Sequence, residues 1–170
     1  TSGAGKTTVA KKLHEYISLS VFVPNFEIRR MISGFKNNRE KSREIMFGLI
    51  KGLVEQALIS GSDVIVDSKI HDDCSGNSVV DKMVKKAKEL GAETYEIILE
   101  LDKEGSMERI RARGFGKGAI LNEDNLEENV DTFLEKMGEY TKSRSDAIVI
   151  DTSRLTEEEV FTKVKEAVGV

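Results

Sequence analysis

The chain has 170 residues, enough for one domain with a full hydrophobic core. Its apolar fraction of 39% and charged fraction of 33% are those of an ordinary soluble globular protein, and no apolar run reaches membrane-spanning length. The net charge of −4 disfavours indiscriminate binding to nucleic acid. No secretory signal is visible, and the lone cysteine, Cys74, excludes an internal disulfide framework. These features favour a cytoplasmic location.

The first half of the chain alternates between helical and strand patterns. Apolar residues at four-residue spacing predict a helix of about three turns directly after the glycine-rich start. The segment 20–25, SVFVPN, reads as a short buried strand stopped by the only proline, and 26–33 as a brief helix. From 40 to 60 a long helix carries two neighbouring apolar ridges, which predict a wide face lying against a sheet. The ridges are Ile45-Leu49-Leu53-Ala57 and Met46-Ile50-Val54-Leu58.

The second half continues the alternation. Gly61 ends the long helix, and the apolar strand DVIVD follows at 63–67. A helix around 80–87 stops at Gly91, and further strands are predicted at 94–101 and 147–151. Helices are predicted at 103–112, at 122–140 and at the C-terminal end, where Thr156 and Glu159 form a capping box. Four strands alternating with helices predict an α/β fold in which helices cover both faces of a parallel sheet.

The first candidate functional motif is TSGAGKTT at residues 1–8. Gly5, Lys6 and Thr7 supply the second half of the pattern G-x-x-x-x-G-K-[ST], whose first glycine would fall one residue before Thr1. A loop of this kind normally follows a strand, so we expect a fifth strand of roughly five to six residues before residue 1.

Each residue type in this loop suits a part of a nucleotide. Glycines let successive backbone N–H groups point at one anion, and the following helix adds its positive dipole end. Lys6 can reach the β- and γ-phosphates, the Thr7 hydroxyl suits Mg²⁺, and the Thr8 hydroxyl an α-phosphate. The plain alternative is a glycine-rich helix start with no ligand. The predicted nucleotide-binding residues are Ser2, Gly3, Ala4, Gly5, Lys6, Thr7 and Thr8.

A second feature is the segment VIVDSKI, in which Asp67 ends a buried strand. Open α/β sheets bind ligands at the carboxyl ends of their strands. Asp67 is therefore predicted to hold the magnesium shell through water or to orient an acceptor hydroxyl. Its alternative role is to cap the following turn. The nearby His71, Asp72 and Asp73 are interpreted as a polar turn rather than a metal cluster.

A third feature is ERIRARGFGKG, where arginines precede Gly114, Gly116 and Gly118. Phosphoryl transfer requires positive charge around the migrating group and the exclusion of water, and a mobile arginine-bearing lid supplies both. The alternative is an exposed basic loop at a helix C-terminus.

With these pieces placed, the chain resembles the P-loop kinases of the polynucleotide-kinase and zeta-toxin type. The resemblance rests on SGAGKTT, FEIRRMISG, VIVDSKI and ERIRARG in that order. It implies a three-layer P-loop NTPase fold with a five-stranded parallel sheet and an arginine lid, in one domain over residues 1–170. It also implies ATP and Mg²⁺ as cofactors. By similarity Lys6 and Thr7 bind the phosphates and metal, and Asp67 is the strand-end aspartate.

The same resemblance implies roles for three arginines, and the sequence departs from the family pattern at one position. Arg109 and Arg113 match lid arginines, and Arg29 an arginine near the acceptor. Relatives tend to carry D-x-x-R in this helix, but Phe26 stands in the place of the aspartate. A shift by one residue pairs Glu27 with Arg30, which restores a carboxylate as the candidate base. The alternative for Glu27 is an ordinary first-turn acid.

The leading hypothesis is a kinase that transfers the γ-phosphate of ATP to a hydroxyl of a small metabolite, a nucleotide or a nucleic-acid end. Residues 29–43 hold six basic side chains against the single acid Glu40, which suits an anionic acceptor. The aromatic residues that could stack on bases in or just before this segment are Phe26 and Phe35, too few to favour nucleic acid. The rival is a nucleotide-binding regulatory module without catalysis, and a GTPase switch ranks last because no N-K-x-D segment is present. The sequence does not indicate an oligomeric state.

Overall fold

A computed structural model describes residues 3–35, 37–68, 79–115 and 122–170. The chain forms two compact units, and each is described by itself. The central unit is Ala10–Thr94, and the terminal unit combines Thr1–Val9 with Tyr95–Val170. Helix α1 (Lys6–Tyr16) begins in the terminal unit and ends in the central unit. One domain can hold two such units, so the single domain over 1–170 stays a prediction.

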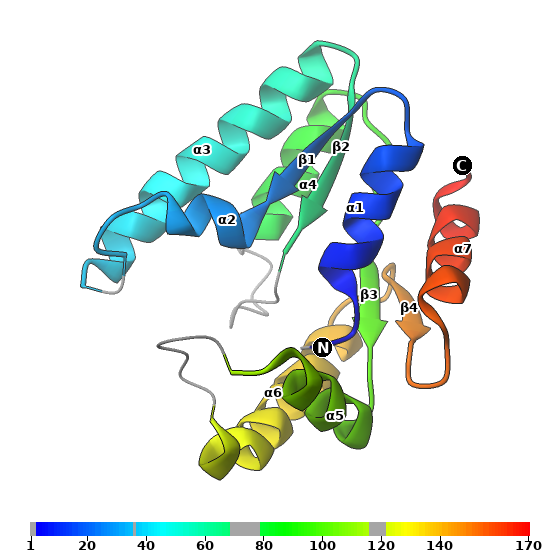
Figure 1. Cartoon of the computed structure of the whole chain (residues 1–170). Helices are drawn as coiled ribbons and strands as arrows, with labels where there is room; N and C mark the ends of the chain where they lie inside the picture. The colour runs from blue at the N-terminus through cyan, green and yellow to red at the C-terminus, as the bar shows by residue number, and fades with distance from the viewer. Residues whose placement is uncertain (1–2, 36, 69–78, 116–121) are drawn as a thin grey trace. The chain divides into compact units, whose positions relative to one another are not determined.

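The central unit is built on two parallel strands. β1 (Ser20–Pro24) pairs with β2 (Asp63–Asp67), in a register that runs from Ser20 opposite Asp63 to Pro24 opposite Asp67. Between them lie α2 (Asn25–Arg30) and α3 (Arg39–Ile59), and α4 (Val79–Glu89) follows β2. Figure 1 shows α3 running along the strand pair, with which it is in contact. The core of this unit consists of Val23, Ile28, Met46, Ile50, Val54 and Met83.

Only one of the two predicted ridges of α3 is buried against this core. Met46, Ile50 and Val54 are buried, whereas Ile45, Leu49 and Leu53 remain 46%, 45% and 45% exposed. The prediction that both ridges lie inward is therefore wrong for Ile45, Leu49 and Leu53. The physical reason is that the core which α3 forms with its neighbours β1, β2 and α4 includes Met46, Ile50 and Val54 but none of the three exposed residues. Gly61 follows α3 with φ 76°, as predicted for a glycine that ends a helix.

The terminal unit also holds two parallel strands. β3 (Ile97–Glu100) pairs with β4 (Ile148–Asp151), with Ile97 opposite Ile148. Its helices are α5 (Lys103–Arg113), the short 3₁₀ helix η1 (Glu123–Asn125), α6 (Leu126–Lys142) and α7 (Glu157–Val168). α5 packs on α6 through Ile110, Leu126 and Val130. α7 contacts β4, and its predicted capping box between Thr156 and Glu159 is confirmed.

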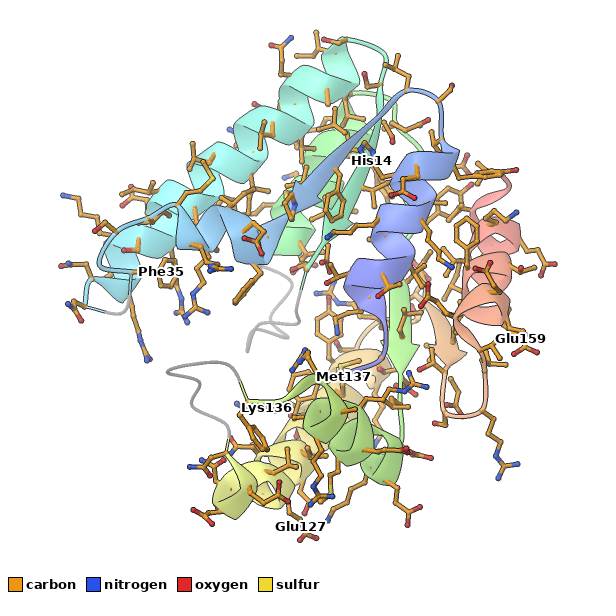
Figure 2. The ribbon with its side chains drawn as sticks, in the orientation of Figure 1. His14, Phe35, Glu127, Lys136, Met137 and Glu159 are labelled. Carbon is orange, nitrogen blue, oxygen red and sulfur yellow. The ribbon has the colours of Figure 1, made fainter. Side chains whose placement is uncertain are left out.

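Lys103 of α5 forms ion pairs with two acidic residues of α6. The Lys103 ammonium lies 2.8 Å from a carboxylate oxygen of Glu127 and 2.8 Å from one of Asp131. Hydrogen bonds to Asp131 and then Glu127 raise the pKa of Lys103 above its usual value. Glu127 is labelled on α6 in Figure 2.

The predicted α/β class with parallel strands is confirmed. In the described ranges the strands form two pairs, β1–β2 and β3–β4, rather than one sheet. The single five-stranded sheet, including a strand before residue 1, stays a prediction. No helix within the described ranges is both long and apolar enough to cross a membrane.

Candidate functional site

The glycine-rich loop enters α1 through two backbone conformations that favour glycine. Gly3 has φ 86° and Gly5 has φ 83°, and α1 begins at the next residue, Lys6. The first intrahelical bond runs from the Val9 N–H to the Gly5 carbonyl at 3.0 Å. Thr7 and Thr8 are exposed in this first turn. The predicted sequence of loop, lysine, hydroxyl and helix start is thus in place at the positive end of the α1 dipole.

The two glycines of the loop face different surroundings. A Cβ atom added to Gly3 would lie 3.3 Å from the Cβ of Arg109 and 3.6 Å from a methyl group of Leu101. A Cβ added to Gly5 would meet no atom within 4 Å in the described part of the chain. Gly3 therefore packs on its neighbours, whereas no atom of the described residues lies close to the Cα of Gly5 on its Cβ side. A loop of this kind at a helix N-terminus fits a phosphate group.

Arg109 fastens this loop to the rest of the terminal unit. Its guanidinium donates to the Gly3 carbonyl at 3.2 Å and to the Thr152 carbonyl at 3.1 Å. Thr152 is itself fully buried, and its hydroxyl donates to the Glu100 carbonyl at 2.7 Å. Arg109 thus links the loop to the residue that follows β4. Arg113, the other predicted lid arginine, is exposed in the last turn of α5.

A second hydrogen-bonded group lies where β3 and β4 end. The Ser153 hydroxyl donates to Asp151 at 2.6 Å and accepts from the Asp102 N–H at 3.0 Å. The Asp102 carboxylate in turn caps α5 by accepting from the Gly105 N–H at 2.7 Å. The Ser153 hydroxyl, followed by its backbone N–H, lowers the pKa of Asp151. Thr152 and Ser153 were not among the predicted site residues, although two hydroxyl residues directly after a predicted strand could have indicated them.

In the central unit Asp67 ends β2 opposite Pro24 and is half-buried. The other predicted acceptor residues lie on α2. Glu27 and Arg30 are both more than half exposed and form an ion pair at 3.6 Å. The Arg29 guanidinium lies 4.5 Å from the centre of the Phe35 ring, in the segment between α2 and α3 (Figure 2).

Asn25, which the sequence did not single out, is a buried polar residue next to Asp67 of β2. It is the first residue of α2, is only 7% exposed, and its Nδ2 donates to the Ser68 hydroxyl at 3.1 Å. Phe26, which stands in the place of the expected aspartate, is 63% exposed instead. A polar residue at the junction of a strand and a helix could have indicated Asn25.

Several predicted residues lie outside the described ranges. They are Ser2, His71, Asp72, Asp73, Gly116 and Gly118. The predicted lid therefore stays a prediction, although Gly114 does end α5 with φ 76°. Among the described residues, no three His, Cys, Asp or Glu side chains gather into a group that could hold a metal ion.

A protein-family model described as an AAA domain, AAA_33, matches residues 1–137. The chain belongs to the AAA_33 family. The match includes the phosphate loop and extends through α5 and most of α6. The P-loop kinase-like resemblance is confirmed at this level, whereas the polynucleotide-kinase and zeta-toxin type stays a prediction.

A solved structure supports the same fold. The tunicamycin resistance protein of Deinococcus radiodurans matches with a TM-score of 0.65 and 19% identity, over 96% of this AAA_33 chain and 90% of that chain. At this identity the likeness shows the fold alone. No curated protein sequence matches the chain. Family and fold together make the chain a kinase-like nucleotide-binding domain of the P-loop type.

Proposed function

We propose that this chain is an ATP- and Mg²⁺-dependent kinase that transfers the γ-phosphate of ATP to a hydroxyl group. The observation that carries the proposal is the loop from Gly3 to Gly5, in which both glycines have positive φ and which leads into α1 at Lys6. Lys6 binds the β- and γ-phosphates, and Thr8 an α-phosphate. Ser2 and Ala4 complete the loop.

The metal would be held by the Thr7 hydroxyl and, through water, by Asp67. Mg²⁺ in such sites is bound by one or two protein oxygens together with phosphate oxygens and water, so a dedicated cluster of acids is not required. When bound, it neutralises charge on the phosphates. Arg113 is proposed to stabilise charge on the migrating phosphoryl group, and Arg109 to hold the loop in shape. The proposed location is the cytoplasm.

The proposed acceptor is a hydroxyl-bearing metabolite, nucleotide or nucleic-acid end, with an anionic group that the basic residues 29–43 would attract. Arg29 and Arg30 are its proposed contacts, and Glu27 is a candidate base. Tunicamycin joins the candidate acceptors because the similar Deinococcus protein is named for resistance to it.

A second candidate is a nucleotide-binding regulatory module that retains the kinase fold without catalysis. It is favoured by the exposed Phe26 at the expected aspartate position and by the surface ion pair that engages Glu27. A loose transition state depends more on positioning and charge than on a strong base, which keeps transfer as the leading proposal.

The test is transfer of radiolabelled γ-phosphate from Mg·ATP to a panel of acceptors: a 5′-hydroxyl oligonucleotide, uridine, a nucleotide, glucose and tunicamycin. We expect transfer to one class, and loss of roughly 100-fold or more in Lys6→Ala. Lys11→Ala removes an exposed lysine from the same helix and should match the wild type. Equal transfer by Lys6→Ala would contradict the proposal, and ATP binding without any transfer would establish the regulatory module.

A further inference from the structure

The strand pair of the central unit ends in a buried amide. Asn25 directly follows β1 and is only 7% exposed. Its Nδ2 donates to the Ser68 hydroxyl, but its Oδ1 is buried with no hydrogen-bond partner among the described residues. Most buried polar side-chain atoms have a partner, so this oxygen requires an explanation.

Leaving the oxygen unpartnered is unfavourable. A buried acceptor without a donor costs about 1–3 kcal/mol. Rotating the amide by half a turn would exchange oxygen and nitrogen but leave one end without a partner. A bound water or a ligand group that donates a hydrogen bond would satisfy this oxygen.

Asn25 lies just beyond the end of two parallel strands. β1 and β2 are parallel, and their last register pair is Pro24 opposite Asp67. Asn25 and Ser68 occupy the next position, joined by the side-chain bond of 3.1 Å. This is the carboxyl edge of the strand pair, where open α/β sheets bind ligands. On α2, Glu27 and Arg30 form an ion pair at the surface and the Arg29 guanidinium lies over the Phe35 ring.

From this geometry we propose that Asn25 is the residue that positions the acceptor hydroxyl, an inference that rests on the proposed kinase function. Oδ1 can only accept a hydrogen bond, so the bound group must carry a donor hydrogen, as the hydroxyl of a kinase acceptor does and an ionised phosphate or carboxylate oxygen does not. The terminal torsion of asparagine is broad. A small rotation of the amide can therefore aim Oδ1 at the hydroxyl without breaking the hydrogen bond from Nδ2 to Ser68.

The resulting step needs no side-chain base at position 25. The hydroxyl oxygen forms its bond to the γ-phosphorus as the bond to the β,γ-bridging oxygen breaks, and the electron pair of that bond leaves on ADP. An amide cannot take up the proton. The proton therefore passes to a group other than Asn25, namely the candidate base Glu27 or a phosphoryl oxygen of the product, and from there to water. The hydrogen bond to Asn25 orients the hydroxyl before the new bond forms.

Three variants test the inference: Asn25→Ala, Asn25→Asp, and Ser68→Ala as the control that leaves Oδ1 in place. We expect Asn25→Ala to lower kcat/KM for the acceptor roughly tenfold, the loss of one neutral hydrogen bond. Its affinity for Mg·ATP and its slow hydrolysis of ATP by water should stay within about twofold of the wild type. Ser68→Ala should lose less than Asn25→Ala.

Asn25→Asp gives a readout that a purely structural role would not move. The carboxylate keeps an acceptor oxygen and adds a base, so transfer at pH 8 should be restored and should fall as the pH drops through the pKa of the new acid. The acceptors are uridine, glucose, a 5′-hydroxyl oligonucleotide and tunicamycin.

The outcomes separate this inference from the function on which it rests. Wild-type transfer with an unaffected Asn25→Ala variant would overturn the role of Asn25 alone. The inference would also be overturned if both Asn25 variants had a similarly lowered melting temperature and a similarly weakened affinity for ATP, because the residue would then be structural. Absence of wild-type transfer to every acceptor would overturn the kinase function and the inference with it.

Discussion

Arg109 and Arg113 lie four residues apart on α5, yet their surroundings differ. Arg109 is half-buried and donates to two carbonyl groups, of Gly3 and Thr152, whereas Arg113 is exposed. A residue with such bonds stabilises the loop whether or not nucleotide is present. The charge of an exposed arginine such as Arg113 matters only when a phosphate group is bound near it.

Arg109→Ala should therefore lower both the melting temperature of the nucleotide-free protein and its ATP affinity, the latter roughly tenfold. Arg113→Ala should leave the melting temperature unchanged and lower only the rate of transfer. Thermal unfolding and calorimetric ATP titration distinguish the two. An unchanged melting temperature in Arg109→Ala would show that its two carbonyl bonds do not hold the loop.

Gly3 is restricted by both its backbone and its neighbour. Gly3→Ala places a side chain at φ 86°, with its Cβ 3.3 Å from that of Arg109. We expect it to lower the free energy of unfolding by about 1–3 kcal/mol. Gly138→Ala is the matched control, because Gly138 lies in α6 with room for a Cβ. That substitution should stabilise the protein by about 0.5–1 kcal/mol in a denaturant titration. Equal effects of the two would contradict this interpretation of the loop.

At the scale of elements, α7 offers a clean test of helix capping. The Thr156 hydroxyl accepts from the Glu159 N–H, while the Glu159 carboxylate accepts from the Thr156 N–H and hydroxyl. Thr156→Ala should lower the free energy of unfolding by about 1 kcal/mol. Thr162→Ala, an exposed change within the same helix, should be neutral or stabilising, since alanine favours helix. Denaturant unfolding of both variants measures these free energies. An unchanged free energy of unfolding in Thr156→Ala would contradict the stabilising role of the cap.

The same cap predicts a dependence on pH. Bonds from the Thr156 N–H and then its hydroxyl lower the pKa of Glu159 below its ordinary 4.5. The contribution of this carboxylate to stability is therefore full above pH 4.5 and is lost as the pH falls through the folded-state pKa.

The measurement is the difference in unfolding free energy between wild type and Glu159→Gln from pH 7 to pH 3. We expect a constant difference down to about pH 4.5 and a decline below it. A difference that grows on acidification would have the wrong sign for a carboxylate with a lowered pKa (Glu159 is labelled in Figure 2).

Local patterns predicted most of these elements. The strand at 63–67 is observed as predicted, and the capping box of α7 was read from two residues three apart. The outward ridge of α3 was not predicted, because periodicity shows which residues share a helix face but not how far a neighbouring sheet extends. Glycine positions after helices were predictable because the backbone conformation there is local.

At the scale of the whole molecule, the phosphate loop could be predicted because its motif is continuous. Its anchor could not be predicted, since Arg109 is 106 residues from Gly3 in sequence. The bond between Asn25 and Ser68 spans 43 residues and depends on the register of β1 and β2. Pairs of this kind depend on tertiary contacts that one sequence does not show. The assignments of Glu27, Arg29 and Arg30 to the acceptor consequently stay predictions.

The most direct test of the central claim is calorimetric titration of the wild type and Lys6→Ala with Mg·ATP, with Lys11→Ala as control. A functional phosphate loop predicts binding in the wild type and in Lys11→Ala, and an affinity at least roughly tenfold weaker in Lys6→Ala. Equal affinity in all three proteins, or no binding by the wild type, would contradict the assignment of residues 2–8 as the nucleotide site.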